Sequence, residues 1–432
     1  MQTRAATIPI RMDRHEVAGG LGDLALMLPL AVGVSAAAGL SLPRVFLCVA
    51  LSYAGTALVF RVPVPVQPMK AMAALVVALG LPASTVTMAS LEIAALLGLI
   101  AVTPLNRHLA HVFPRPVVRG IQLAIGVLLV RSAVRMAVGA GALPGVSLAV
   151  DVGVFRLTAS LVVALALAAV LVAAKERARL PAGLAVVGLG ALAGLLLAGA
   201  GLATPGTAPA GDAPLSPRLP GLGDAWTAFI VLVLPQIPLS LGNAVYATDD
   251  VLRHYFGKGA ARVTPARLCA SMSLMNVGSA LLGGLSLCHG CGGATAHYRL
   301  GARTAGATLC AAAVYAALAA VAAAGVSPLF IPGAVLAALL LYVGLEHCLL
   351  VCDLVRGDDL ACATVIAVTA IVSGNLAVGF VTGFALYLVL RRSPLRRLRM
   401  RWPTIVSRGA PPPAPCAPAV VSEVGVTVPV RD

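Results

Sequence analysis

The chain has 432 residues, of which 59% are hydrophobic and 11% charged, with a mean hydropathy of +0.97 and a net charge of +15. A soluble protein carries about 25% charged residues, so the composition excludes a soluble globular protein and predicts an all-α polytopic membrane protein. The cations lie in loops and tails between apolar runs, which indicates membrane topology and excludes nucleic acid as a partner.

Apolar runs of about 20 residues, enough to cross a bilayer, recur along the chain. Assuming a cytoplasmic N-terminus, the segments expected inside hold 25 of the 31 Lys and Arg, as the positive-inside rule requires. Both termini are therefore expected to be cytoplasmic, and the plasma (cell inner) membrane is the expected location. Twelve spans would keep the same end parity, but hydropathy and helix breakers favour fourteen, at 19–40, 43–60, 63–81, 84–103, 117–137, 155–173, 182–201, 224–247, 267–284, 286–300, 304–324, 328–350, 359–373 and 375–391.

The motif GLGD occurs at 20–23 and again at 221–224, and each copy leads into a span. It divides the fourteen spans into seven and seven, and an odd number per half makes the second half inverted, as in many secondary transporters. The predicted organisation is a cytoplasmic tail (1–17), a first seven-span repeat (18–203), an extracellular linker (204–223), an inverted second repeat (224–391) and a basic, then Pro-rich cytoplasmic tail (392–432).

The third span opens with PVPVQPMKAMAA (63–74), whose three prolines prevent a continuous helix. We expect residues 63–67 to be extended and a helix to start near Pro68, inside the membrane. The tenth span, LSLCHGCGGATAHYRLGART (285–304), repeats this design with a glycine-dense core at 288–293 and a short helix ending at Arg299. Two interrupted spans at matching places in two halves point to a transporter's binding site; a pair of kinked packing helices is the alternative.

Each helix N-terminus carries free N–H groups and about half a positive charge. Two such ends plus Lys70 sum to about +2, which suits a dianion. The alternative is that Lys70 pairs with a carboxylate such as Glu92 or Glu346, or reaches toward an interface.

The eighth span contains LPQIPLSLGNAVYATDD (234–250), in which Gln236, Ser240 and Asn243 share one face if the helix persists past Pro238. These neutral hydrogen-bonding groups suit the oxygens of an oxyanion, although hydrogen bonds between helices would also account for them.

These motifs resemble the molybdate transporter family of the sulfate-permease-like (SulP) superfamily. The resemblance rests on PVPVQPMKAMAA, PQIPLSLGNAV, GGLGDLALMLPL and CHGCGGATAHYRLGART, and it covers most of 16–391. It implies a seven-plus-seven inverted repeat divided into core and gate bundles, two half-helices in spans 3 and 10, and alternating access. From the short tail after the last span we expect no regulatory STAS domain of the kind typical of sulfate permeases.

The resemblance implies a secondary-active transporter of molybdate, with sulfate or another oxyanion as the alternative substrate. The partners expected are that anion, the lipid bilayer and a second copy of the chain in a homodimer; no cofactor is indicated. The site residues carried over are Gln67, Pro68, Met69 and Lys70 from span 3, Gln236, Ser240 and Asn243 from span 8, and His289, Gly290, Gly292, Gly293 and Thr295 from span 10.

Other motifs allow other chemistry. Cys288, His289 and Cys291 form a Cys-x-x-Cys motif that suggests a membrane-embedded enzyme or a metal site, but a single such pair among glycines better suits a backbone-lined anion pocket. A Cys291→Ala change discriminates between these, because transport should survive it and thiol chemistry should not.

Glu92, within the fourth span, and Glu346 are candidates for carrying a coupling proton, or for structural ion pairs. A channel is the third class of function, besides a transporter and an enzyme, and it would show anion flux that does not saturate.

Overall fold

The computed structural model describes residues 9–21, 24–105, 114–138, 149–152, 155–174, 189–190, 192–193, 196, 221–324, 333–355 and 357–392. Most of the predicted seventh span, the linker residues 204–220 and the tail after 392 lie outside these ranges. The first half contains α1 (Arg14–Leu21), α2 (Leu24–Ala38), α3 (Leu42–Phe60), β1 (Gln67–Pro68), α4 (Lys70–Leu79), α5 (Ala83–Val102), α7 (Arg115–Val138), β2 (Ala149–Val152), β3 (Phe155–Thr158) and α8 (Ala159–Ala174).

The second half begins with one continuous helix, Gly223–Arg262. Its successive segments are α10 (Leu222–Thr227), the π-helical η2 (Ala228–Val233), α11 (Leu234–Leu239), the π-helical η3 (Ser240–Tyr246), α12 (Ala247–Phe256) and the 3₁₀-helical η4 (Gly257–Arg262). Then follow α13 (Pro265–Leu282), β4 (Leu287–Cys288), α14 (Cys291–Arg299), α15 (Gly306–Ala323), α16 (Gly333–Leu349), η5 (Leu350–Asp353), α17 (Gly357–Ser373) and α18 (Leu376–Arg392).

Five helices within the described residues are long and apolar enough to cross a membrane by length and composition: Leu42–Phe60, Ala83–Val102, Arg115–Val138, Gly223–Arg262 and Gly306–Ala323. The expectation of an all-α protein with several apolar spans is therefore confirmed. The predicted span at 155–173 needs one correction, because Phe155–Thr158 pairs with Ala149–Val152 as an antiparallel hairpin and the helix begins only at Ala159.

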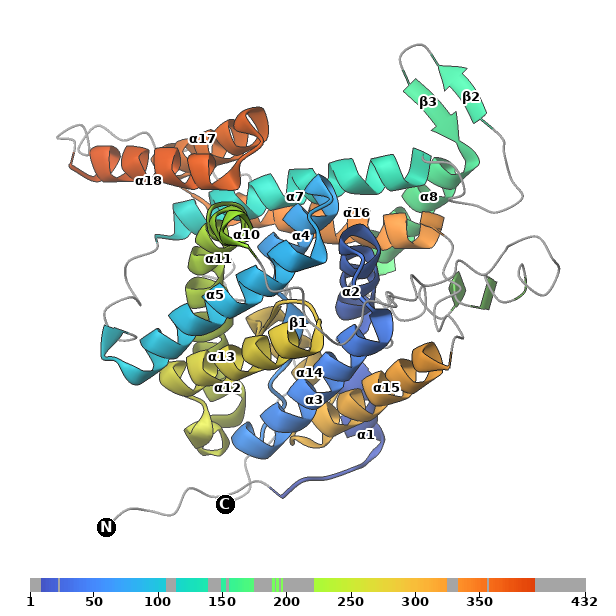
Figure 1. Ribbon diagram of the computed structural model, residues 1–432, viewed down its shortest axis with the longest axis vertical. Coiled ribbons are helices and arrows are strands. Elements are labelled where there is room, and N and C mark those ends of the chain that lie inside the picture. Colours follow the sequence, from blue (N-terminus) through green and yellow to red (C-terminus); the bar gives the residue numbers. More distant parts are fainter. Residues whose placement is uncertain are drawn as a thin grey trace, which may run out of the picture.

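The helices pack in two groups. One contains α7, α8, α16, α17 and α18, in the upper part of Figure 1. The other contains α1, α3, α5, α12, α13, α14 and α15, where Tyr53 of α3 stacks on Tyr315 of α15 with ring centroids 5.8 Å apart. Helices α2, α4 and α11 lie between the groups, since α4 and α11 contact α7 and α2 contacts α16.

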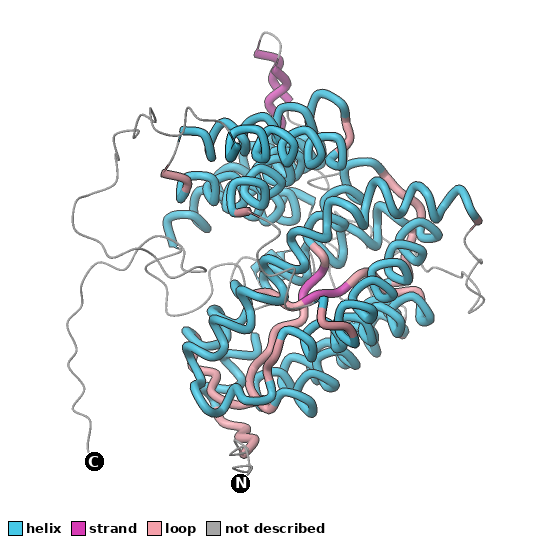
Figure 2. The backbone as a smooth tube through the Cα atoms, turned by 90° about the vertical axis from the view of Figure 1, so that its left-hand side faces the viewer, coloured by secondary structure: helices cyan, strands magenta, loops and turns pink. Residues whose placement is uncertain are grey.

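The two interrupted spans have the predicted form. After α3 the chain passes without helix through residues 62–66 to β1, with a tight turn where the amide of Val64 donates to the carbonyl of Val62 at 2.8 Å, and β4 approaches the same point from the end of α13. The two short strands pair antiparallel, Gln67 opposite Cys288 and Pro68 opposite Leu287, in the middle of the helices (Figure 2). At 10 and 9 residues, α4 and α14 are each about 15 Å long or less, too short to cross a bilayer.

Two predicted boundaries are wrong. The helix of the third span, α4, begins at Lys70, with Met69 as its N-cap. Pro68 is not in its first turn, because this residue is held in the strand pair. The eighth span does not end at 247 but continues to Arg262, since Val251 and Leu252 on this extension are buried in a second apolar cluster with Phe60 and Leu268. Pro238 is accommodated inside the helix, which turns π-helical two residues later.

Candidate functional site

The β1–β4 pair sets the starting points of α4 and α14 side by side. The amide of Met69 donates to the carbonyl of Ser286 at 2.9 Å, which ties the first strand to the second just before α4 begins. The Sγ of Cys288 lies 3.6 Å from the carbonyl oxygen of Pro68. Both helices therefore present their N-terminal ends, with free amides and a positive dipole end, at one place in the fold.

Lys70 is the first residue of α4, and its side chain is half-buried. Within the described residues it forms no ion pair, so the alternative in which Glu92 or Glu346 neutralises it is not observed. Its charge interacts electrostatically with His347 of α16, a helix of the other group. A cation at this position opposes the helix dipole, which makes an anion in front of it favourable.

Gln236 and Ser240 lie on the face of the long helix that contacts α4. The Oε1 of Gln236 accepts from the amide of Ala71 at 3.1 Å, and its Nε2 donates to the Oγ of Ser240, also at 3.1 Å. Both side chains are buried, with 2% and 0% of their surface exposed. The two residues share one face, as predicted, and Gln236 satisfies one of the free amides of α4.

The first turn of α14 packs on Gln67 at two glycines and is open at the third. A methyl group on Gly290 would lie 2.6 Å from Oε1 of Gln67, and one on Gly293 would lie 2.5 Å from Nε2 of the same side chain, so neither position has room for one. Gly292, by contrast, is exposed and would meet no atom within 4 Å. Within the described residues the amides of Gly292 and Gly293 have no hydrogen-bond partner.

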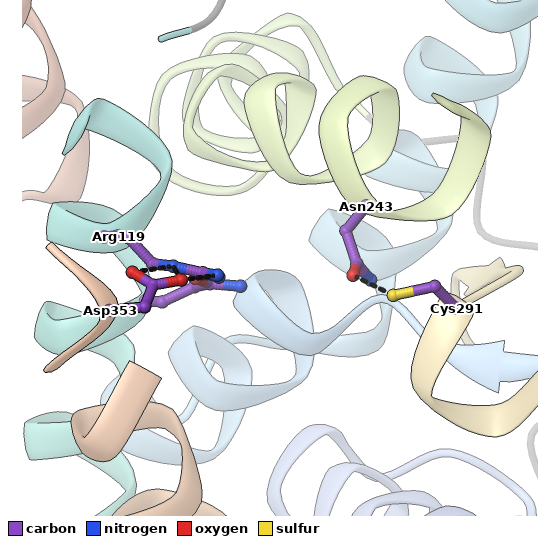
Figure 3. Close-up of polar contacts among 5 residues, drawn as sticks. Arg119, Asn243, Cys291 and Asp353 are labelled. Atoms are coloured by element: carbon purple, nitrogen blue, oxygen red, sulfur yellow. Dashed lines mark hydrogen bonds and ion pairs between the residues drawn. The ribbon is translucent and has the colours of Figure 1, made fainter. Parts of the chain in front are cut away.

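Asn243 joins the long helix to α14. The Sγ of Cys291, the first residue of α14, donates to Oδ1 of Asn243 at 3.0 Å (Figure 3). The long helix therefore contacts the first turns of both short helices, through Gln236 at α4 and through Asn243 at α14. The predicted third member of the polar face thus reaches α14 and not α4, since η3 shifts its direction by the wider π-helical turn.

Buried polar side chains brace the two extended segments. His289 is fully buried, with Nδ1 2.8 Å from the carbonyl oxygen of Pro65 and Nε2 3.2 Å from Oγ of Ser271. Asn276 of α13 donates from Nδ2 to the carbonyl of Leu287 at 2.7 Å and accepts from its amide at 2.9 Å. Both ring nitrogens of His289 are engaged, so this side chain positions backbone and presents no free nitrogen to a ligand or a reaction.

The remaining predicted residues lie around this centre. The hydroxyl of Thr295 donates to the carbonyl of Cys291 at 2.9 Å and lies 3.3 Å from the Tyr255 hydroxyl, so it stabilises the second turn of α14. Glu92 lies in α5 with a buried Oε2 that has no partner in the described part of the chain. Glu346 is half-buried in α16, next to His347.

Two other features lie around the helix ends. Arg119 of α7 donates to both carboxylate oxygens of Asp353 in η5, at the left of Figure 3. Arg119 also donates to Oε1 of Gln122. An apolar cavity lies beside α4; it is lined by Val34, Met72, Ala73, Val76, Val86, Leu232, Leu285 and Ser286. With Ser286 as its one polar side chain, this cavity has no group that would hold an anion.

Sequence reasoning missed three members of this arrangement. Asn276 and Ser271 lie in α13, where a polar residue facing inward is the available signal, and His347 lies in α16 beside the expected Glu346. Cys291 was considered for thiol chemistry and not as a hydrogen-bond donor to Asn243. Each of these contacts joins segments far apart in the chain, which no local motif records.

The fold is similar to that of solved anion transporters. The transmembrane domain of a cyanobacterial bicarbonate transporter, BicA, matches with a TM-score of 0.58 at 19% identity, covering 88% of this chain and 99% of that one. Murine solute carrier 26 family member A9, an anion transporter in the inward-facing state, matches with a TM-score of 0.61 at 15% identity, covering 89% and 69%. The chain is thus an integral multi-pass membrane protein with the fold of these transporters.

The chain belongs to the molybdate transporter family. The family profile described as "Molybdate transporter of MFS superfamily" matches residues 15–129 and 228–346. Molybdate transporter 2 of Arabidopsis thaliana is 26% identical over 91% of this chain and 90% of its own length, and molybdate transporter 1 of Chlamydomonas reinhardtii is 28% identical over 94% and 97%. The protein is therefore a member of a transporter family and not an enzyme, as the motifs predicted.

Proposed function

We propose that this protein is a secondary-active transporter of molybdate, MoO₄²⁻, and that the anion binds between the N-terminal ends of α4 and α14. One observation carries the proposal: two short helices begin side by side at the β1–β4 pair, and Lys70, at the start of one, has no ion-pair partner among the described residues. Membership of the molybdate transporter family supports the choice of substrate.

The chemistry of the site matches a tetrahedral dianion. Two helix ends contribute about half a positive charge each and Lys70 one more, which balances a charge of −2. The free amides of Gly292 and Gly293 and the amide group of Asn243 supply hydrogen-bond donors at the α14 side, and the open space at Gly292 leaves room for the anion. Molybdate is a hard oxyanion and needs no thiolate ligand.

The other predicted residues then hold the helix ends in place and do not contact the anion. Gln67 packs against Gly290 and Gly293, Gln236 and Ser240 link the long helix to α4, and Pro68 and Met69 hold the strand pair and the helix start. His289 and Thr295 brace the backbone. In this assignment the direct contacts with the anion come from Lys70, Asn243 and the first-turn amides.

Transport would follow from motion of one helix group against the other. We assign α7, α8, α16, α17 and α18 as the gate bundle and the remaining helices as the core, within fourteen spans arranged as two inverted sevens. Both termini then lie in the cytoplasm at the plasma membrane, the chain forms a homodimer, and Glu92 or Glu346 carries the coupling proton. The two packed groups of helices and the similarity to solved transporters support this architecture.

Sulfate or another oxyanion is the alternative substrate. Charge and tetrahedral shape are common to sulfate and molybdate, and the donors at the helix ends do not by themselves measure size. The solved structures of the same fold include a bicarbonate transporter, so the arrangement is compatible with several anions.

Uptake of labelled molybdate into proteoliposomes tests the proposal, with excess sulfate as competitor. We expect saturable uptake that resists sulfate, is lost in Lys70→Ala and persists in Lys258→Ala, which removes an exposed lysine in η4. Uptake suppressed equally by sulfate would favour the general oxyanion permease. Uptake that persists in Lys70→Ala would contradict the charge argument, and flux that never saturates would indicate a channel.

A further inference from the structure

Cys291 and Asn243 form a hydrogen bond whose polarity is set by chemistry. A neutral thiol is a weak donor and a weak acceptor, and the Sγ of Cys291 faces the Oδ1 of Asn243, which can only accept, so the thiol is the donor. The Sγ–Oδ1 distance of 3.0 Å agrees with this. Cys291 is 6% exposed, so the contact is shielded from water.

This contact decides which way the amide group of Asn243 points. With Oδ1 bonded to Cys291 (Figure 3), the Nδ2 group is left for another partner, and it lies near Gly290, where a methyl group placed on the glycine would be 3.8 Å from Nδ2. Within the described residues Nδ2 has no hydrogen-bond partner, and the side chain of Asn243 is only half-buried. Two N–H donors are therefore available beside the first turn of α14.

We propose that Cys291 is a positioning residue that holds the amide of Asn243 with its NH₂ group toward the bound oxyanion. This inference rests on the proposed function, since it assumes an anion at the helix ends. A carboxamide exchanges its oxygen and its NH₂ group by a half-turn about its last bond, and the anion is repelled by the oxygen. The thiol donor removes that choice before the anion arrives, so no binding energy is used to orient the side chain.

The role requires a protonated, reduced thiol. A thiolate, or a thiol converted to a thioether or disulfide, has no hydrogen to donate, and a thiolate would accept from Nδ2 and turn the amide oxygen toward the anion. A serine at 291 keeps a donor, while alanine and valine remove it. Alanine is smaller than cysteine and valine is larger, so an effect that both variants share comes from the loss of the donor and not from a change of volume in one direction.

The test is the kinetics of molybdate uptake by reconstituted full-length protein, with KM and maximal rate measured separately. We expect Cys291→Ala to raise KM about three- to tenfold at an unchanged maximal rate, and Cys291→Ser to stay within about twofold of the wild type. Cys291→Val is the second donor-free variant, for use if Cys291→Ala does not fold. Cys362→Ala, which removes a buried thiol in α17, is the matched control and should leave KM unchanged.

The same measurement in the Asn243→Ala background separates positioning from packing. If Cys291 acts through Asn243, its replacement by alanine has no further effect on KM once the amide is gone. A wild-type KM in both donor-free variants, or an equal rise of KM with and without Asn243, would overturn the inference while leaving the transporter in place. Absence of saturable molybdate uptake by the wild type would overturn the proposed function itself, and the positioning role with it.

Discussion

Exchanging the Gln236 amide for a carboxylate isolates charge from structure at the start of α4. In Gln236→Glu one carboxylate oxygen can still accept from the amide of Ala71, now 3.1 Å from Oε1, and the other can accept from the hydroxyl of Ser240. Both buried contacts survive, so the variant should fold. It places a negative charge beside the proposed anion, so KM for molybdate should rise while the protein stays folded.

The magnitude follows from the geometry. The amides adjacent to Ala71 belong to Lys70 and Met72, and neighbouring Cα atoms are about 3.8 Å apart, so an anion on those amides lies about 6 Å from the new carboxylate. At an effective dielectric of about 20, a charge of −1 and a charge of −2 at that distance repel by about 5 kcal/mol. Attraction between the carboxylate and Lys70 offsets part of this, and we expect KM to rise about 30- to 1,000-fold.

The assay is molybdate uptake into proteoliposomes, paired with thermal unfolding of the same preparations. Gln236→Leu is the matched control: it leaves the amide of Ala71 and the Ser240 hydroxyl without their partner, which should cost about 1–3 kcal/mol of stability. A Gln236→Glu protein that transports with the wild-type KM would refute the placement of the anion at α4. A Gln236→Glu protein that unfolds as readily as Gln236→Leu would contradict the expectation that its contacts offset the desolvation of the buried carboxylate.

Three further predictions concern packing and capping. Gly293→Ala should lose about 1–3 kcal/mol of stability, because its methyl group would lie 2.5 Å from Nε2 of Gln67 and 2.7 Å from Cβ of Pro65. Gly292→Ala is the control: its methyl group would have no atom within 4 Å, so this variant should unfold at the wild-type temperature. Glu16→Gln should destabilise the protein by about 1–3 kcal/mol, since the buried carboxylate accepts from the amides of Arg303, Thr304 and Ala307 at 2.9 to 3.0 Å; Glu16→Gln melting with the wild type would contradict this. Asp13 directly precedes α1, and its Oδ1 accepts from the amides of Glu16 at 3.1 Å and His15 at 2.8 Å, which lower the pKa of Asp13 below its ordinary value of 3.8. The stability that these bonds contribute is complete above that value and is lost as the pH falls through the lower folded-state pKa. The difference in thermal unfolding between about pH 3 and about pH 5 should therefore be smaller in Asp13→Asn than in the wild type, and an equal difference would contradict this role of Asp13.

The interrupted spans are the part of the fold that local chemistry predicts. Prolines at 63, 65 and 68 and the glycines after Cys288 preclude continuous helices on steric and hydrogen-bonding grounds, and both breaks occur where expected. The shared face of Gln236 and Ser240 likewise follows from helical spacing. What local chemistry does not contain is the pairing of Pro68 with Leu287, which moves the start of α4 to Lys70.

The role of His289 shows the same limit. A histidine between two cysteines and three glycines is equally suited to a ligand, a base or a brace. Its ring nitrogens are taken by Pro65, 224 residues away, and by Ser271. Similarly, the polar residues after 247 look like a loop by composition, and only the apolar cluster that receives Val251 and Leu252 makes them helical. Tertiary contacts decide these cases.

Locating molybdenum by its anomalous scattering, in crystals of the protein grown with molybdate, tests the central claim most directly. Hydrogen bonds from the amides of Gly292 and Gly293 and from Lys70 would place the metal atom within about 5 Å of those donors. We predict a single anomalous peak between the first turns of α4 and α14, absent from crystals of Lys70→Ala. A peak in the apolar cavity beside Met72, or one that persists without Lys70, would contradict binding between the helix ends.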